Sequence, residues 1–114
     1  MKLKLLLFLG AIAFLSIGNA NATAHLVDVT ITKLNINKSL GNYVFIKTSQ
    51  APNVIGCHQD SNWNLVLKLE TDIDNKIYAG LLAAHASQSL VSLDGTGTCA
   101  PYNIENLQNF SIYK

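Results

Sequence analysis

The sequence predicts a mainly β domain with one helix and one disulfide, preceded by an export signal. Several stretches alternate apolar and polar residues with the period of a half-buried strand. One other apolar stretch instead has the spacing of a helix. The 114 residues contain two cysteines, which is enough for one covalent link in a small exported domain.

The N-terminal residues have the features of a cleaved signal peptide. These features are a positive start, an apolar run and small residues at peptidase spacing: Lys2 and Lys4, Leu5 to Ile17, and Ala20-Asn21-Ala22. The apolar run is shorter than the ~20 residues of a membrane span. The alternative is a retained membrane anchor. We expect cleavage after Ala22, with Ala24 as second choice, and a secreted or periplasmic protein with one domain over residues 23–114.

The charge of this mature domain argues against two classes of partner. It contains six lysines and seven acidic residues, so its net charge is −1, and the sequence contains no arginine. Arginine supplies the two-pronged contact that phosphate and guanine recognition favour. We therefore expect no nucleic acid and no insertion into or binding of an anionic membrane.

The alternating stretches predict five strands. They cover Leu26–Ile36, Tyr43–Ser49, Trp63–Glu70, Ser89–Asp94 and Asn106–Tyr113. In the first strand, Val27, Val29 and Ile31 should face the core. The later apolar residues are out of phase, so a bulge is expected near Thr32 or Lys33.

The middle strands differ in how well the pattern defines their faces. In the second strand, either Val44 and Ile46 or Tyr43 and Phe45 could point inward. The third strand alternates clearly, with two expected faces: Trp63, Leu65, Leu67 and Leu69 on one, and Asn64, Val66, Lys68 and Glu70 on the other.

A helix should follow the third strand. Asp72 is expected to cap it, and Asp74 lies in the first turn, where the helix dipole favours negative charge. The helix has two neighbouring apolar stripes and is expected to be covered on more than one side: Ile73, Ile77, Leu81 and Ala84 form one stripe, and Tyr78 and Leu82 form the other. Gly80 lowers helix propensity by about 1 kcal/mol, which indicates close packing at that position. Residues 95–98 (GTGT) predict a tight turn into Cys99.

Cys57 and Cys99 are expected to form a disulfide, because cysteines of exported proteins usually pair. Closing a loop of about 40 residues would stabilise the domain by about 4 kcal/mol in chain-entropy estimates. The alternative is two buried free thiols. A metal site is not expected, because Cys-His-x-Asp is not a known ligand spacing.

The order strand, strand, strand, helix, strand, strand is that of the OB-fold. This small five-stranded antiparallel barrel binds oligonucleotides or oligosaccharides. Other five-stranded α+β folds share the same order, so the pattern alone favours an OB-fold-like barrel without excluding them.

Residues 42–57 (NYVFIKTSQAPNVIGC), followed by a tryptophan-led strand, a helix and a GTGTC turn, resemble one toxin family. This is the B-subunit family of subtilase cytotoxin and the pertussis-like typhoid toxin. The resemblance implies an OB-fold, a homopentameric ring beside a separate enzymatic subunit, and binding to sialylated or other cell-surface glycans.

No residue pattern indicates catalysis or a cofactor. The chain contains serine, histidine and aspartate but no Gly-x-Ser-x-Gly elbow. His85 lies on the apolar helix and is expected to be a core or interface histidine. Asp72 and Asp74 are explained by the charge of a helix start. We therefore expect a non-catalytic protein.

The candidate ligand site lies where the disulfide would join two loops. Sugar binding needs an exposed aromatic side chain and polar groups, which these loops offer: His58, Asp60, Asn62 and Trp63 on one, and Tyr102 and Asn103 on the other. The alternative for Trp63 is the first core residue of its strand. The two functions considered are glycan binding in a toxin-like ring and a monomeric exported interaction module that binds no glycan.

Overall fold

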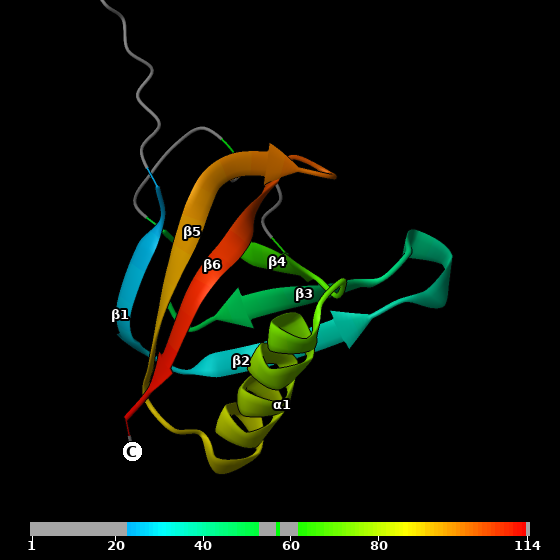
Figure 1. Ribbon diagram of the computed structural model, residues 1–114. Coiled ribbons are helices and arrows are strands. Elements are labelled where there is room, and N and C mark those ends of the chain that lie inside the picture. Colours follow the sequence, from blue (N-terminus) through cyan, green and yellow to red (C-terminus); the bar gives the residue numbers. More distant parts are fainter. Residues whose placement is uncertain (1–22, 53–56, 58–61, 114) are drawn as a thin grey trace, which may run out of the picture.

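The computed structural model describes residues 23–52, 57 and 62–113. These residues are mainly β with one α helix, as predicted (Figure 1). The elements are β1 His25–Val29, β2 Ile31–Ile36, the 3-10 helix η1 Lys38–Leu40, β3 Tyr43–Thr48, β4 Leu65–Lys68, α1 Asp72–Ser87, β5 Val91–Ala100 and β6 Ile104–Ile112.

All six strands belong to one sheet, in the order β1-β5-β6-β4-β3-β2. Neighbours are antiparallel except β4 and β6, which are parallel. The expected five-stranded antiparallel barrel is not confirmed, because the described sheet has six strands and one of its pairs is parallel. Within the described residues the sheet has two edges, β1 and β2. The parallel pair arises because α1 and β5 separate β4 from β6, and such a crossover brings the chain back in the same direction.

The expected first strand is two strands, because the chain changes partner at Thr30. β1 pairs with β5, whereas β2 pairs with β3. The pairing of β1 is irregular between Leu26 and Val29, where Asp28 adopts a φ of 55°. This irregularity turns Val27 outward, so the prediction that Val27 faces the core is wrong.

The expected bulge in the following segment is confirmed. The register of β2 against β3 shifts between Ile31 and Lys33. Such a shift bends a strand and changes the direction of the side chains that follow it. Ile31 is fully buried, while Leu34 is half-buried beyond the shift.

The glycine-rich stretch at residues 95–98 was expected to be a turn, but it lies inside β5. The reason is a contact from the neighbouring strand. The side chain of Glu105 on β6 lies over Gly95, and an added Cβ there would overlap its carboxylate. Glycine at this position therefore makes room for a buried side chain, and the strand continues to Ala100.

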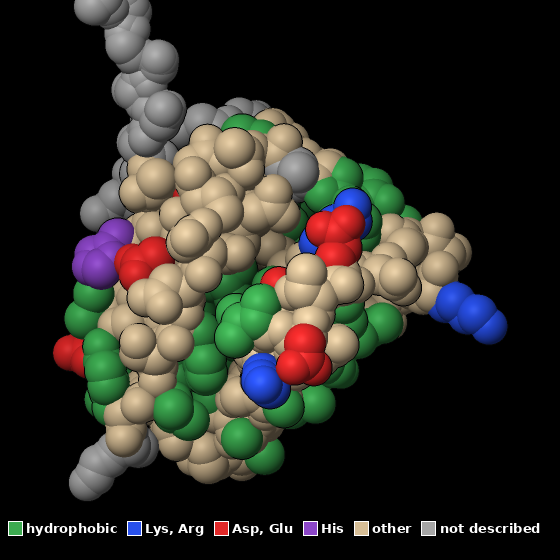
Figure 2. All heavy atoms as spheres, viewed as in Figure 1, with side chains coloured by type: hydrophobic (Ala, Val, Ile, Leu, Met, Phe, Trp, Pro, Cys, Tyr) green, Lys and Arg blue, Asp and Glu red, His purple; other side chains and the backbone are tan. Residues whose placement is uncertain are grey.

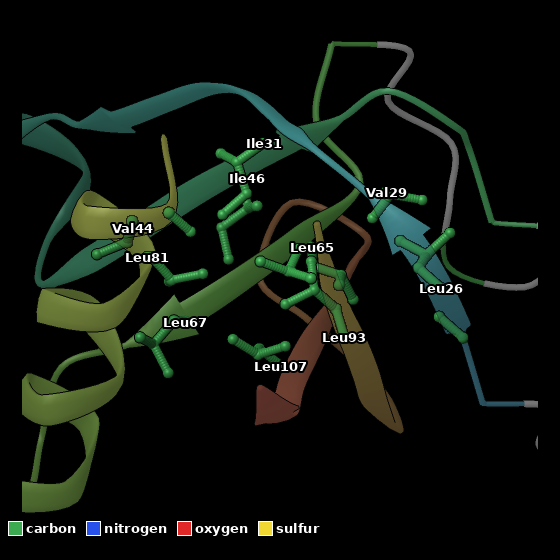
Figure 3. Packing of buried hydrophobic residues seen from close by; sticks show 13 residues of the cluster. Leu26, Val29, Ile31, Val44, Ile46, Leu65, Leu67, Leu81, Leu93 and Leu107 are labelled. Carbon is green, nitrogen blue, oxygen red and sulfur yellow. The ribbon is translucent and has the colours of Figure 1, made fainter. Parts of the chain in front are cut away.

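The main core lies between the sheet and α1 (Figure 3). Val44 and Ile46 of β3 point into it, which decides between the two faces considered for that strand. Leu65 and Leu67 of β4 do the same, and Leu81 joins them from the helix. Burial of these apolar side chains is the main stabilising contribution to the domain.

The helix begins one residue earlier than expected, because Thr71 and not Asp72 is the N-cap. The Thr71 hydroxyl accepts the Asp74 N–H at 3.4 Å, and the Asp74 carboxylate accepts the Thr71 N–H at 2.9 Å. This reciprocal pair is a capping box. Partial burial raises the pKa of Asp74, but hydrogen bonds from the Glu70 and Thr71 N–H groups outweigh it, and the pKa lies below its ordinary value.

Gly80 allows α1 to lie directly against β6. A Cβ at Gly80 would lie 2.5 Å from Cε2 of Phe110, so the prediction of close packing there is confirmed. The opposite side of the helix keeps small and apolar residues at the surface, including Leu82. Figure 2 shows hydrophobic side chains reaching the surface around α1.

We predict that Gly80→Ala destabilises the protein although alanine is the better helix former. The propensity gain is about 1 kcal/mol, while overpacking against Phe110 costs about 1–3 kcal/mol. The free energy of unfolding, measured in urea, should therefore fall. In a Phe110→Leu background, where the ring edge is absent, the same change should raise it. An equal effect in both backgrounds would contradict the role of this contact.

We predict that Asp74→Asn lowers the free energy of unfolding at pH 7 by about 0.5–1 kcal/mol, the usual scale of a cap. The folded-state pKa of Asp74 is lowered. Its contribution is thus fully present above its unfolded pKa of about 3.9 and is lost as the pH falls through the folded value. The wild type and the variant should converge in acid. Asp72→Asn, at an exposed position beside Lys76, is the control and should show a smaller gap.

Candidate functional site

The predicted disulfide between Cys57 and Cys99 is present. The two Cα atoms lie 5.2 Å apart, and the cysteines are 42 residues apart in the sequence. Cys57 is buried and Cys99, near the end of β5, is exposed. The bond therefore attaches the segment that precedes β4 to the end of β5, as the candidate site requires.

Four of the six predicted site residues belong to the described part of the chain. Asn62, Tyr102 and Asn103 are exposed, and Trp63 is half-buried. His58 and Asp60 lie outside the described residues. The geometry of the site is therefore built from Trp63 and Tyr102.

Trp63 belongs to a second, smaller hydrophobic cluster. Its buried members are Phe45, Val66 and Ile104, with Leu40, Tyr43 and Trp63 packed against them. Leu65 and Leu67, which the alternation placed on the same face as Trp63, belong instead to the main core. The prediction that Trp63 shares a face with Leu65 and Leu67 is wrong, because Trp63 is half-buried against the second cluster and does not belong to the main core.

Phe45 brings Trp63 and Tyr102 together. The ring centroids of Phe45 and Trp63 are 5.8 Å apart, and those of Phe45 and Tyr102 are 5.6 Å apart. Both pairs are tilted, by 50° and 53°. Such distances and angles are those of favourable aromatic contacts. We call these three residues the aromatic platform.

The turn between β5 and β6 presents Tyr102 to Phe45. Tyr102 and Asn103 both have positive φ, 59° and 60°, and the Ile104 N–H donates to the Pro101 carbonyl at 3.3 Å. Two successive residues with positive φ are a requirement of the type I′ turn, which matches the twist of paired strands. Tyrosine is uncommon in this conformation. Its ring contacts Phe45, and its hydroxyl lies 3.5 Å from the Leu40 carbonyl.

Asn64 holds the other side of the platform in place. Its N–H donates to the Ile46 carbonyl at 2.8 Å, and its side-chain oxygen accepts the Thr48 N–H at 2.8 Å. These bonds extend the pairing of β3 with the chain before β4. Asn64 was expected on the polar face but is buried, because its amide replaces strand hydrogen bonds. The residue next to it, Trp63, is thereby given a defined position.

A lysine of β2 completes the arrangement. The Lys33 ammonium lies 4.6 Å from the centroid of the Trp63 ring, within the range of a cation–π contact. Sequence reasoning missed Lys33 and Phe45 as site residues. The available signal was weak: Phe45 could be assigned to either face of its strand, and Lys33 stood at the expected bulge.

The described histidines have structural partners. His85 is half-buried and donates from Nδ1 to the Ile31 carbonyl at 2.9 Å, which ties the end of α1 to β2. His25 contacts the Asp94 carboxylate. The amide of Asn109 donates to Asp94, and this bond together with His25 holds the pKa of Asp94 below its ordinary value despite partial burial.

Across residues 23–52, 57 and 62–113, no three His, Cys, Asp or Glu side chains lie close enough to hold a metal ion. Within the same ranges, none of the helices has the length and apolar character needed to cross a bilayer.

The aromatic platform is suited to binding. The Tyr102 ring is exposed and the Trp63 ring is half-buried, Phe45 lies buried against both, and the Lys33 ammonium lies over the Trp63 ring. Sites with few placed polar groups beside aromatic faces orient small ligands. Comparison of the chain with protein-family models, curated proteins and solved structures found no match.

Proposed function

We propose that the chain is an exported, non-catalytic protein that binds cell-surface glycans through the aromatic platform. The observation that supports this most is the meeting of Trp63 and Tyr102 on Phe45, with Lys33 above the Trp63 ring. Trp63 and Tyr102 lie on separate segments that the disulfide links. A covalent bond and a left-handed turn thus hold aromatic side chains at the surface, which core packing alone does not require.

Sugars fit this arrangement because a pyranose ring has an apolar face and a polar edge. The apolar face would lie on the platform, as it does on amphipathic aromatic side chains in general. The exposed side chains of Asn62 and Asn103 would form hydrogen bonds with the hydroxyl groups of the sugar. The Lys33 ammonium would attract a carboxylate, so sialylated glycans are the preferred class.

An OB-fold-like layout is part of the proposal. β1 and β2 stand at opposite edges of the sheet, yet only Thr30 separates them in the chain. If they are the two halves of one bent first strand, the strand order runs as a ring of five. The loops and outer strand face of an OB-fold are its usual oligosaccharide site, and the platform lies on such a face.

The proposal also includes a homopentamer that accompanies a separate enzymatic subunit, as the family resemblance implies. Support comes from large apolar side chains that remain at the surface, among them Ile73 and Leu82 of α1 and Leu90 and Ile112 beyond it. Apolar groups gathered at a surface often mark a subunit contact. The alternative is a monomeric exported module that binds another protein.

We predict that the oxidised chain Thr23–Lys114 binds sialylated probes on a glycan array. Trp63→Ala and Tyr102→Ala should each weaken binding by about 10- to 100-fold, the scale of an aromatic hot spot. Tyr113→Ala is the matched control, since Tyr102 and Tyr113 are each 50% exposed. Equal losses in all three variants, or no binding to any glycan, would rule out the platform as a glycan site.

We predict a pentamer for the same protein in native mass spectrometry. Leu82→Glu should shift the mass toward the monomer, because a charge buried in a subunit contact is unfavourable. Lys76→Glu, one and a half turns away on an exposed position, is the control. A monomer at every concentration would contradict the ring and leave the exported interaction module as the better proposal.

A further inference from the structure

Glu105 is a buried carboxylate that the glycan proposal does not use. It lies on β6 with 1% of its surface exposed. Its oxygens accept the Ala24 N–H at 3.0 and 3.2 Å and the Gly97 N–H at 2.8 Å. A carboxylate is rarely buried unless hydrogen bonds of this kind compensate for the water it loses.

Two glycines of β5 and the backbone of Ala24 accommodate the buried Glu105 side chain. Gly95 leaves the space that the Glu105 side chain occupies, and Gly97 has a φ of 88°, which favours glycine. Ala24 is bound through both of its backbone groups, because its carbonyl also accepts the Gly95 N–H at 2.9 Å. Although it precedes β1, Ala24 is only 1% exposed.

We propose that Glu105 is the binding site for the N-terminal end of the mature chain, and that processing therefore leaves Ala24 in the protein, with Thr23 as the first residue. This inference rests on export, which is part of the proposed function, but not on glycan binding. It decides between the two cleavage sites that the small-residue pattern allows.

Hydrolysis before Thr23 creates a useful charge. A signal peptidase hydrolyses the peptide C–N bond between Ala22 and Thr23. The hydroxyl group of water joins the carbonyl carbon of Ala22, and the remaining hydrogen goes to the Thr23 nitrogen. The new amine has a pKa of about 7.7–8.0 and is largely protonated at neutral pH. This ammonium stands one residue from the N–H that Glu105 binds, so processing places a positive charge beside the buried carboxylate.

Hydrolysis after Ala24 would instead remove a residue that Glu105 binds. It would remove the N–H that both Glu105 oxygens accept and the carbonyl that accepts the Gly95 N–H. A buried carboxylate that loses one of its donors becomes less stable, even though the Gly97 N–H still binds it. The two candidate sites differ by two residues, yet only cleavage before Thr23 keeps Ala24 as a donor to Glu105.

The first test compares chains that begin at Thr23, Ala24 and His25, each released from a removable fusion without extra residues. The first two should melt within a few degrees of each other, because both keep the Ala24 nitrogen. The His25 chain should melt about 5–15 °C lower by circular dichroism. Equal melting temperatures for all three would overturn the proposal.

Two variants separate the hydrogen bonds from simple packing. Ala24→Gly in the Thr23 chain keeps the backbone groups and loses the methyl group, so it should show less than half of the truncation loss. Glu105→Gln should shrink the difference between the Thr23 and His25 chains, since coupled groups are not additive. Glu70→Gln, at an exposed glutamate, is the control and should leave that difference unchanged.

The intact mass of the product exported from the full chain gives an independent answer. A mass equal to residues 23–114 supports the proposal, and a chain that begins at His25 overturns it. A product that keeps residue 1 shows that the N-terminal segment is retained and overturns the processing part of the proposal, and the melting series then tests only whether Glu105 binds Ala24. Failure of glycan binding affects neither readout, so the two proposals can fail separately.

Discussion

The pairing of β3 with β4 is the interaction on which both sides of the molecule depend. Residues 44–46 and 65–67 are buried without interruption, so each of these strands is covered on both faces. Side chains of one parity fill the main core, while Phe45 and Val66 point the other way. The aromatic platform therefore stands directly on the backs of core strands. A one-residue slip in the register between β3 and β4 would exchange the core face with the face that carries the aromatic platform.

The parts of the fold that local pattern determines were predictable from the sequence. The strands, the helix and the disulfide were found at about their positions because alternation, helical spacing and cysteine number act over short distances or need no geometry. Faces were harder to predict where both sides of a strand are apolar, as at Phe45 and Val66. Trp63 was assigned to the wrong side for a different reason. The neighbouring Asn64 has a buried side-chain amide that bonds to β3, and this breaks the alternation that the sequence predicts.

Contacts between distant residues account for the remaining differences. Gly95 and Gly97 are residues typical of a turn, but here they accommodate Glu105 of the next strand. Gly95 leaves space for its side chain, and the Gly97 N–H donates to its carboxylate. Thr71 and Asp72 are both good caps, and only the position of Asp74 relative to each distinguishes them. In the site, Trp63 and Tyr102 could be linked through the disulfide. The ring between them, Phe45, and the lysine above, Lys33, depended on strand pairing that no local pattern contains.

The position of the tryptophan has a spectroscopic consequence. Trp63 is the only tryptophan in the chain, and it is half-buried beside the Lys33 ammonium. Indole emission depends on the electric field and the water around the ring, so the intrinsic fluorescence of this protein reports on the platform and not on the main core. A shift in the emission wavelength would report a change in the surroundings of Trp63 at that surface. It would not report a change in the packing of the main core.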